Sequence, residues 1–182
     1  TLDVLSEGRL RLGIGTGWNN IEYEALNENF SNRGVRSVEQ IKLMKELWQN
    51  ESLTFSGKWH KINNAGINPL PINKSIPIWF GGYHENVFKR VGELGDGWIG
   101  FFKTIKEGLQ IINAIKSSAE INKRNSKDIG IEVPLSIQNN FNASDISKKI
   151  TQLNKIGVTH ISINTMNMGL KSNADHIKVI KD

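Results

Sequence analysis

The feature that most constrains this chain is a regular alternation of strand-like and helix-like segments. Short apolar runs typical of buried strands alternate with longer stretches in which apolar residues recur every three or four positions, as in amphipathic helices. The expected strands are 9–17, 76–80, 98–101, 129–137 and 160–164. The expected helices carry their apolar stripes within 38–48, 87–94, 105–119, 146–156 and 174–180. A helix after each strand predicts right-handed crossovers and a parallel sheet, either doubly wound or closed into a barrel.

One segment interrupts this alternation. Between Asn50 and Ser75, two short β-like pieces, 53–55 and 58–62, flank Gly57 and predict a hairpin-like excursion. The chain opens without an initiator methionine, inside what looks like the end of a helix. We therefore expect a single domain over 1–182 that is incomplete at its N-terminus, with the excursion 51–75 between its first helix and second strand.

Composition argues against several kinds of site. The 182 residues include no cysteine, so neither a disulfide nor a thiolate metal site can form, and this composition suits a reducing cytosol. Neither an HExxH spacing nor a Gly-x-Ser-x-Gly elbow occurs, which leaves metal-dependent hydrolysis and acyl transfer unsupported. Apolar runs such as 76–80 are far shorter than the roughly 18 residues that span a bilayer. We expect a cytoplasmic protein that uses no metal and no membrane.

The net charge of +5 raises the question of nucleic-acid binding. Lysine and arginine are scattered among acidic residues along the expected helices, and no dense basic block occurs. This distribution favours a solvated helical exterior over a basic binding module. We expect no nucleic-acid partner.

The first candidate site is the glycine-rich segment 13–19, at the carboxyl end of the first expected strand. It differs from the dinucleotide-binding fingerprint because Trp18 stands where a third glycine is needed. Two interpretations stay open: the glycines let a barrel strand pack closely, or a flat ring system lies against bare backbone.

The second candidate site is the glycine pair Gly81-Gly82, between a buried strand and the next helix. A glycine pair just before a helix exposes backbone N–H groups and the positive end of the helix dipole, which together bind phosphate. The alternative is a plain turn with Glu85 or Asn86 near the helix cap. In a barrel, the loop that holds this glycine pair lies on the catalytic face, and His84 is the histidine expected there.

Other charged residues have structural interpretations. Asp96 lies in a helix-to-strand turn at the opposite, stability face and is expected to act as a turn and cap residue. His160 begins a strand at that same face. Arg33 and Arg36 precede a helix near the catalytic face, where structural ion pairing, with Glu39 as a neighbouring partner, is favoured over contact with an anionic ligand.

Several segments, taken in order, resemble the luciferase-like monooxygenase family, and most of all its coenzyme F420-dependent class. These segments are 1–10, 13–19, 65–71, 76–82, 94–98 and 162–166. The resemblance implies a (β/α)8 barrel of the TIM type, in which these five strands correspond to the fourth through eighth. It also implies hydride transfer between a small organic substrate and a reduced flavin-type ring, in an oxidoreductase or monooxygenase. Coenzyme F420 is the implied cofactor, with FMN as the alternative.

The resemblance also implies the cofactor-binding residues. They are Thr16, Gly17, Trp18 and Asn19 beside the ring, and Gly81, Gly82, Tyr83 and His84 around the phosphate. Some relatives have further glycine at the last two of these positions, so which backbone amides make the contacts stays open. No catalytic residue is assigned, because the cofactor supplies the difficult chemistry.

The absent first three strands of the barrel leave two sheet edges and an apolar interior exposed, which invites association. We therefore expect a homo-oligomer, a dimer, and weak or no cofactor binding by this chain alone. One alternative is an inactive barrel fragment. Another is a phosphate-binding isomerase or lyase barrel, which requires lysine or paired carboxylates at the strand ends. Those positions instead hold Thr16, Tyr83, Phe101, Gln138, Asn139 and Asn164.

Overall fold

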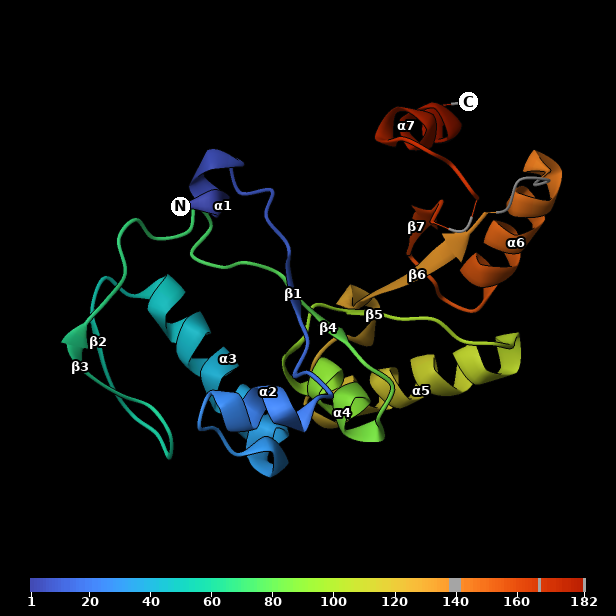
Figure 1. Ribbon diagram of the computed structural model, residues 1–182. Helices are drawn as coiled ribbons and strands as arrows, with labels where there is room; N and C mark the ends of the chain where they lie inside the picture. The colour runs from blue at the N-terminus through green and yellow to red at the C-terminus, as the bar shows by residue number, and fades with distance from the viewer. Residues whose placement is uncertain (138–141, 167, 182) are drawn as a thin grey trace.

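The computed structural model describes residues 1–137, 142–166 and 168–181. Within them, one sheet contains five parallel strands (Figure 1). The strands are β1 (Leu12–Ile14), β4 (Ile78–Gly81), β5 (Gly97–Ile99), β6 (Gly130–Ser136) and β7 (His160–Asn164). The five expected strands and their parallel pairing are confirmed. The first is shorter than the expected 9–17.

The strand order β1-β4-β5-β6-β7 decides between the two open architectures. A doubly wound sheet reverses its order at a switch point, which places helices on both faces, whereas this order never reverses. Right-handed crossovers that always advance in one direction place every helix on the same face, as in a barrel. The fold is therefore the α/β fold of a (β/α)8 barrel, here as five consecutive strand–helix units.

The helices of these units match the expected periodic stretches. They are α3 (Arg33–Gln49), α4 (Glu85–Leu94), α5 (Ile105–Ile121), α6 (Ala143–Lys155) and α7 (Asn173–Lys181). Figure 1 shows α3, α4 and α5 along one side of the sheet, with α6 beside β6. In the part of the chain that the structure describes, no helix is both long and apolar enough to cross a bilayer.

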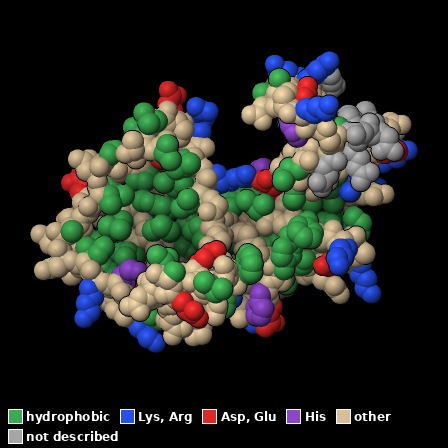
Figure 2. Space-filling view, in the orientation of Figure 1, with side chains coloured by type: hydrophobic (Ala, Val, Ile, Leu, Met, Phe, Trp, Pro, Cys, Tyr) green, Lys and Arg blue, Asp and Glu red, His purple; other side chains and the backbone are tan. Residues whose placement is uncertain are grey.

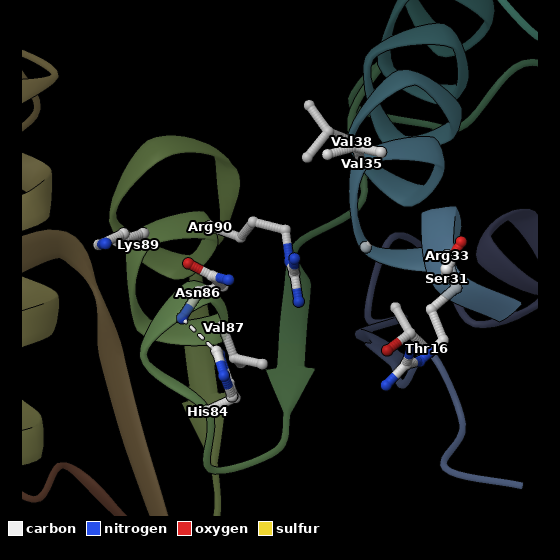
Figure 3. Close-up of a pocket in the computed structure, with 11 residues that line it drawn as sticks. Thr16, Ser31, Arg33, Val35, Val38, His84, Asn86, Val87, Lys89 and Arg90 are labelled. Carbon is white, nitrogen blue, oxygen red and sulfur yellow. Dashed lines mark hydrogen bonds between the residues drawn. The ribbon is translucent and has the colours of Figure 1, made fainter.

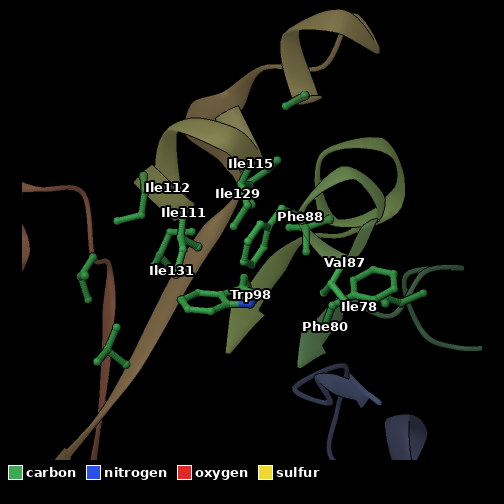
Figure 4. Packing of buried hydrophobic residues seen from close by; sticks show 14 of the residues in the cluster. Ile78, Phe80, Val87, Phe88, Trp98, Ile111, Ile112, Ile115, Ile129 and Ile131 are labelled. Atoms are coloured by element: carbon green, nitrogen blue, oxygen red, sulfur yellow. The ribbon is translucent and has the colours of Figure 1, made fainter. Parts of the chain in front are cut away.

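The main core lies between the sheet and these helices. Ile78, Phe80 and Trp98 project from β4 and β5 and are almost completely buried against α4 and α5 (Figure 4). Alternate residues of β6, among them Ile131 and Val133, join the same cluster. Burial of each such side chain stabilises the fold by about 1.5–3 kcal/mol, so this layer holds the sheet against the helices.

The helix-free face of the sheet holds a polar cluster around Trp79. The guanidinium of Arg11 stacks over the Trp79 ring at 4.2 Å and pairs with Glu132 at 2.6 Å. His160 meets the same ring edge-on, with ring centroids 4.9 Å apart. His160 therefore lies at the amino ends of the strands, as the sequence predicted, and away from their carboxyl ends.

The excursion after α3 is an antiparallel hairpin of β2 (Leu53–Ser56) and β3 (Lys61–Ala65). The expected first piece, 53–55, lies in β2, whereas the expected second piece, 58–62, starts too early because residues 58–60 form the turn. Glu39 fixes that turn: its carboxylate accepts the N–H groups of Lys58, Trp59 and His60 at 2.7–2.9 Å and contacts His60 Nδ1 at 2.8 Å.

Four further short elements lie outside the strand–helix units and the hairpin, and the first of them matches the helix end expected where the chain opens. They are α1 (Leu2–Leu5), α2 (Asn20–Ala25) and the 3-10 turns Phe30–Asn32 and Ser126–Asp128. The segment after Gly17 contains a helix that the sequence did not predict. Asn19 caps that helix, since its side chain accepts the Ile21 N–H at 3.2 Å.

Candidate functional site

Two glycine loops meet at the carboxyl edge of the sheet. They follow β1 and β4, which pair directly, with Ile14 opposite Phe80, 66 positions later in the sequence. Gly17 and Gly82 have left-handed φ angles of 72° and 120°, so each loop turns where other residues are strained. The structure thus brings the two predicted site segments side by side.

The loop after β1 presents its backbone to open space. A Cβ atom built on Gly13 or Gly15 would meet nothing within 4 Å, so packing within the described part of the chain does not require glycine there. Trp18 is 86% exposed beside them. The Tyr23 hydroxyl donates to the Thr16 carbonyl and ties the loop to α2.

The loop after β4 is fixed by a hydrogen bond from β5 and leads directly into α4. The Gly82 carbonyl accepts the indole N–H of Trp98 at 2.8 Å. His84 is the N-cap of α4, because its Nδ1 accepts the Asn86 N–H at 3.2 Å. Glu85 and Asn86, which the sequence placed near the cap, are the first two residues of the helix.

Three successive backbone amides of this loop stay free for an anion. The N–H groups of Tyr83, His84 and Glu85 donate to no partner among the residues that the structure describes. Glu85 is the first residue of a ten-residue helix, so these groups lie at the positive end of its dipole. The arrangement fits a phosphate group.

Tyr83 connects this loop to the next strand end. Its hydroxyl oxygen accepts the Phe101 N–H at 2.8 Å, and its ring packs against Phe101 with centroids 4.8 Å apart. Burial raises the pKa of the Tyr83 hydroxyl, although the Phe101 hydrogen bond opposes this effect. The uncharged side chain of Tyr83 therefore links the loop after β4 to the end of β5.

Large exposed apolar side chains follow several strand ends and form a group that was not predicted from the sequence. They are Trp18, Tyr83, Phe101 and Met166, each between 47% and 86% exposed. They surround a single sheet edge, which suits a flat apolar ligand. A large apolar residue two to four positions after a strand, where a polar turn residue is typical, is the signal that identifies them.

The charged residues singled out from the sequence have defined places. Asp96 accepts the Ile78 N–H at 2.8 Å and lies 3.6 Å from Arg124, which confirms its role in a turn at the far face. Arg36 pairs with Glu28, so ion pairing is confirmed but Glu39 as its partner is wrong. Arg33 instead donates to the carbonyls of Gly17 and Phe30.

The remaining strand-end positions contribute less. The Asn164 side chain accepts the Met166 N–H at 2.9 Å and shapes the turn after β7. Gln138 and Asn139 lie outside the described residues. Among the described residues, no group of three histidine, aspartate or glutamate side chains is arranged to hold a metal ion.

The fold and the edge with its two glycine loops define a class of protein. The chain belongs to the luciferase-like monooxygenase family, whose profile matches residues 1–149. Its relatives include the F420-dependent glucose-6-phosphate dehydrogenases of Mycobacterium avium, 34% identical over 153 residues, and Amycolatopsis mediterranei, 32% identical over 152 residues. Each alignment covers 75% of this chain and 43% of the relative, so the chain spans less than half the length of these proteins.

Solved structures agree on the fold. An F420-dependent secondary alcohol dehydrogenase, in complex with an F420–acetone adduct, has a TM-score of 0.74 at 17% identity, covering 90% of this chain and 66% of that one. The F420-dependent tetrahydromethanopterin reductase of Methanopyrus kandleri has a TM-score of 0.70 at 16% identity, covering 93% and 72%. The monooxygenase RslO1 of Streptomyces bottropensis has a TM-score of 0.70 at 13% identity, covering 93% and 65%.

Proposed function

We propose that this protein is a coenzyme F420-dependent oxidoreductase that transfers a hydride between the deazaflavin ring and a small organic substrate. The observation that carries the proposal is that two loops, each with a glycine at positive φ, lie side by side at the carboxyl ends of the paired strands β1 and β4. The names of the relatives support the choice of cofactor, because the glucose-6-phosphate dehydrogenases and two of the structural neighbours are described as F420-dependent.

The chain offers suitable groups for both ends of such a cofactor. In this proposal the ring lies against the bare backbone of the first loop, with Thr16, Gly17, Trp18 and Asn19 around it. The phosphate accepts the free N–H groups after Gly81-Gly82, at Tyr83 and His84. The bound ring supplies the hydride chemistry, and the protein positions it and excludes water.

The test is equilibrium binding of F420 and, separately, of FMN to the full-length protein, followed by the absorbance and fluorescence of each ring. We expect F420 to bind at micromolar or lower concentration and FMN to bind more weakly. Tighter binding of FMN would replace the proposed cofactor with the alternative. Binding of neither ring would contradict the proposed function.

We also propose that the protein acts as a homodimer. Figure 2 shows hydrophobic side chains gathered over the side where α3 and the hairpin lie. An apolar cavity of about 320 Å³ opens there, lined by residues that include Ile14, Ile41, Met44 and Leu47. Sedimentation equilibrium tests this proposal, since a mass of one chain at all concentrations would contradict it.

A further inference from the structure

A cavity of about 560 Å³ lies between α3 and α4, directly beside the two glycine loops (Figure 3). It shares Thr16 and His84 with the candidate site. Three cationic side chains line it: Arg33 of α3, and Lys89 and Arg90 of α4. Among the residues that the structure describes, no aspartate or glutamate lines this cavity.

Arg90 reaches across the cavity from α4 toward α3 (Figure 3). Its guanidinium rests against Gly34, where a Cβ atom would lie 2.8 Å from Nη1, so glycine at this position gives the guanidinium its room. The Nε atom is buried and has no hydrogen-bond partner in the described part of the chain. Burial and then the nearby charge of Arg33 lower the pKa of Arg90, while Glu93 opposes them but itself pairs with Lys42 at 3.3 Å.

Arg33 lies on the opposite wall and is held in place by its neighbours. Its guanidinium stacks on the Phe30 ring at 3.6 Å, and its Nε and Nη1 groups donate to the carbonyls of Gly17 and Phe30. Within the described residues its Nη2 group has no partner, and no carboxylate pairs with it. Two guanidinium groups thus share one cavity without a neutralising acid.

We infer that this cavity is an anion subsite that holds phosphate or carboxylate groups of a ligand extending outward from the glycine loops. Guanidinium groups bind both kinds of oxyanion through paired, charge-assisted hydrogen bonds. The bound anion also relieves the repulsion between Arg33 and Arg90. The identification of that ligand as the cofactor rests on the proposed function, whereas the anion chemistry rests on the cavity itself.

The test measures binding of inorganic pyrophosphate and of citrate to the purified protein by calorimetry, as separate phosphate and carboxylate probes. We compare the wild type with Arg33→Gln, Arg90→Gln and the double variant, and use Arg9→Gln, in an exposed loop, as the matched control. Losing both charged contacts is expected to weaken the preferred probe at least about tenfold, with no change in the control. Absence of binding by both probes, or equal binding by all variants, would overturn the inference.

A second pair of variants leaves both arginines intact. Val35 lines the cavity and is 60% exposed, so Val35→Glu places a carboxylate beside the guanidinium groups, and Val35→Gln is the uncharged control. We expect the glutamate to raise the melting temperature relative to glutamine and to weaken the preferred probe at least about tenfold. If the glutamate and glutamine variants bind the probe equally, the subsite is wrong.

The outcomes also separate this inference from the proposed function. If the protein binds no F420 but its pyrophosphate or citrate binding depends on Arg33 and Arg90, the subsite stands and the proposed function fails. If F420 binds equally to the wild type and the double variant, while neither variant pair changes probe binding, the subsite fails and the proposed function stands.

Discussion

At the scale of single residues, the packing of Trp79 explains two glycines on the helix-free face of the sheet. The ring lies across Gly97 and Gly130 on the two neighbouring strands, and a Cβ atom at either position would lie 2.3 Å from ring atoms. Glycine is therefore required there by close approach of a side chain. Gly13 on β1 differs, because its Cβ would meet nothing within 4 Å.

This difference predicts the effect of adding one methyl group. Gly130→Ala forces the Trp79 ring or the strand to move and is expected to cost about 1–3 kcal/mol of folding free energy. Gly13→Ala, which adds the same group in open space, is expected to change stability by less than about 1 kcal/mol. Urea unfolding of both variants measures the difference, and equal losses would contradict the packing described here.

At the scale of elements, α4 begins with an unusual cap. His84 replaces the side-chain oxygen of a common capping residue with its Nδ1 atom. His84→Ala is expected to destabilise the protein by about 0.5–2 kcal/mol, whereas His84→Asn, which restores a preferred cap, is expected to be close to neutral. Thermal unfolding of the two variants distinguishes them, and an alanine variant as stable as wild type would argue against the cap.

The contact between α3 and the hairpin predicts a pH dependence. Burial disfavours the charged form of Glu39, but hydrogen bonds from His60, Trp59 and Lys58 outweigh it and lower the pKa to about 2 from 4.5. A carboxylate whose folded pKa is depressed adds stability above its unfolded pKa, and that stability is lost as the pH falls toward the folded value. Glu39→Gln should therefore melt below the wild type at pH 7, and the gap should narrow between about pH 4.5 and pH 2. A gap that is independent of pH would contradict this account.

The helices, strands and hairpin differ in how far local sequence patterns predict them. The stripes of α4 and α5 and the apolar run of β4 were predicted because local periodicity reports burial directly. The hairpin turn at 58–60 was misplaced because Glu39, about 20 positions earlier, determines it. The short helix α2 was not predicted because it has no buried residue and hence no apolar stripe.

At the scale of the whole molecule, the order of the strands creates the candidate site. Periodicity predicted five strand–helix units but left the sheet either doubly wound or closed into a barrel, because local patterns carry no information on strand order. The unreversed order β1-β4-β5-β6-β7 brings the loops after β1 and β4 together across the intervening hairpin. The sequence predicted each loop as a separate candidate, whereas their adjacency and the cationic cavity beside them depend on the three-dimensional arrangement.

The central claim is that the paired glycine loops hold the deazaflavin cofactor, and the most direct test is F420 titration of full-length Gly82→Ala. Gly82 has a φ of 120°, and a Cβ atom there would lie 3.2 Å from Val87, so alanine should distort the loop that presents the free amides. The control is Gly157→Ala, with a φ of 100° in a turn at the opposite edge of the sheet. The account predicts at least about tenfold weaker F420 binding for Gly82→Ala, and wild-type affinity for the control. Wild-type affinity in Gly82→Ala would contradict it.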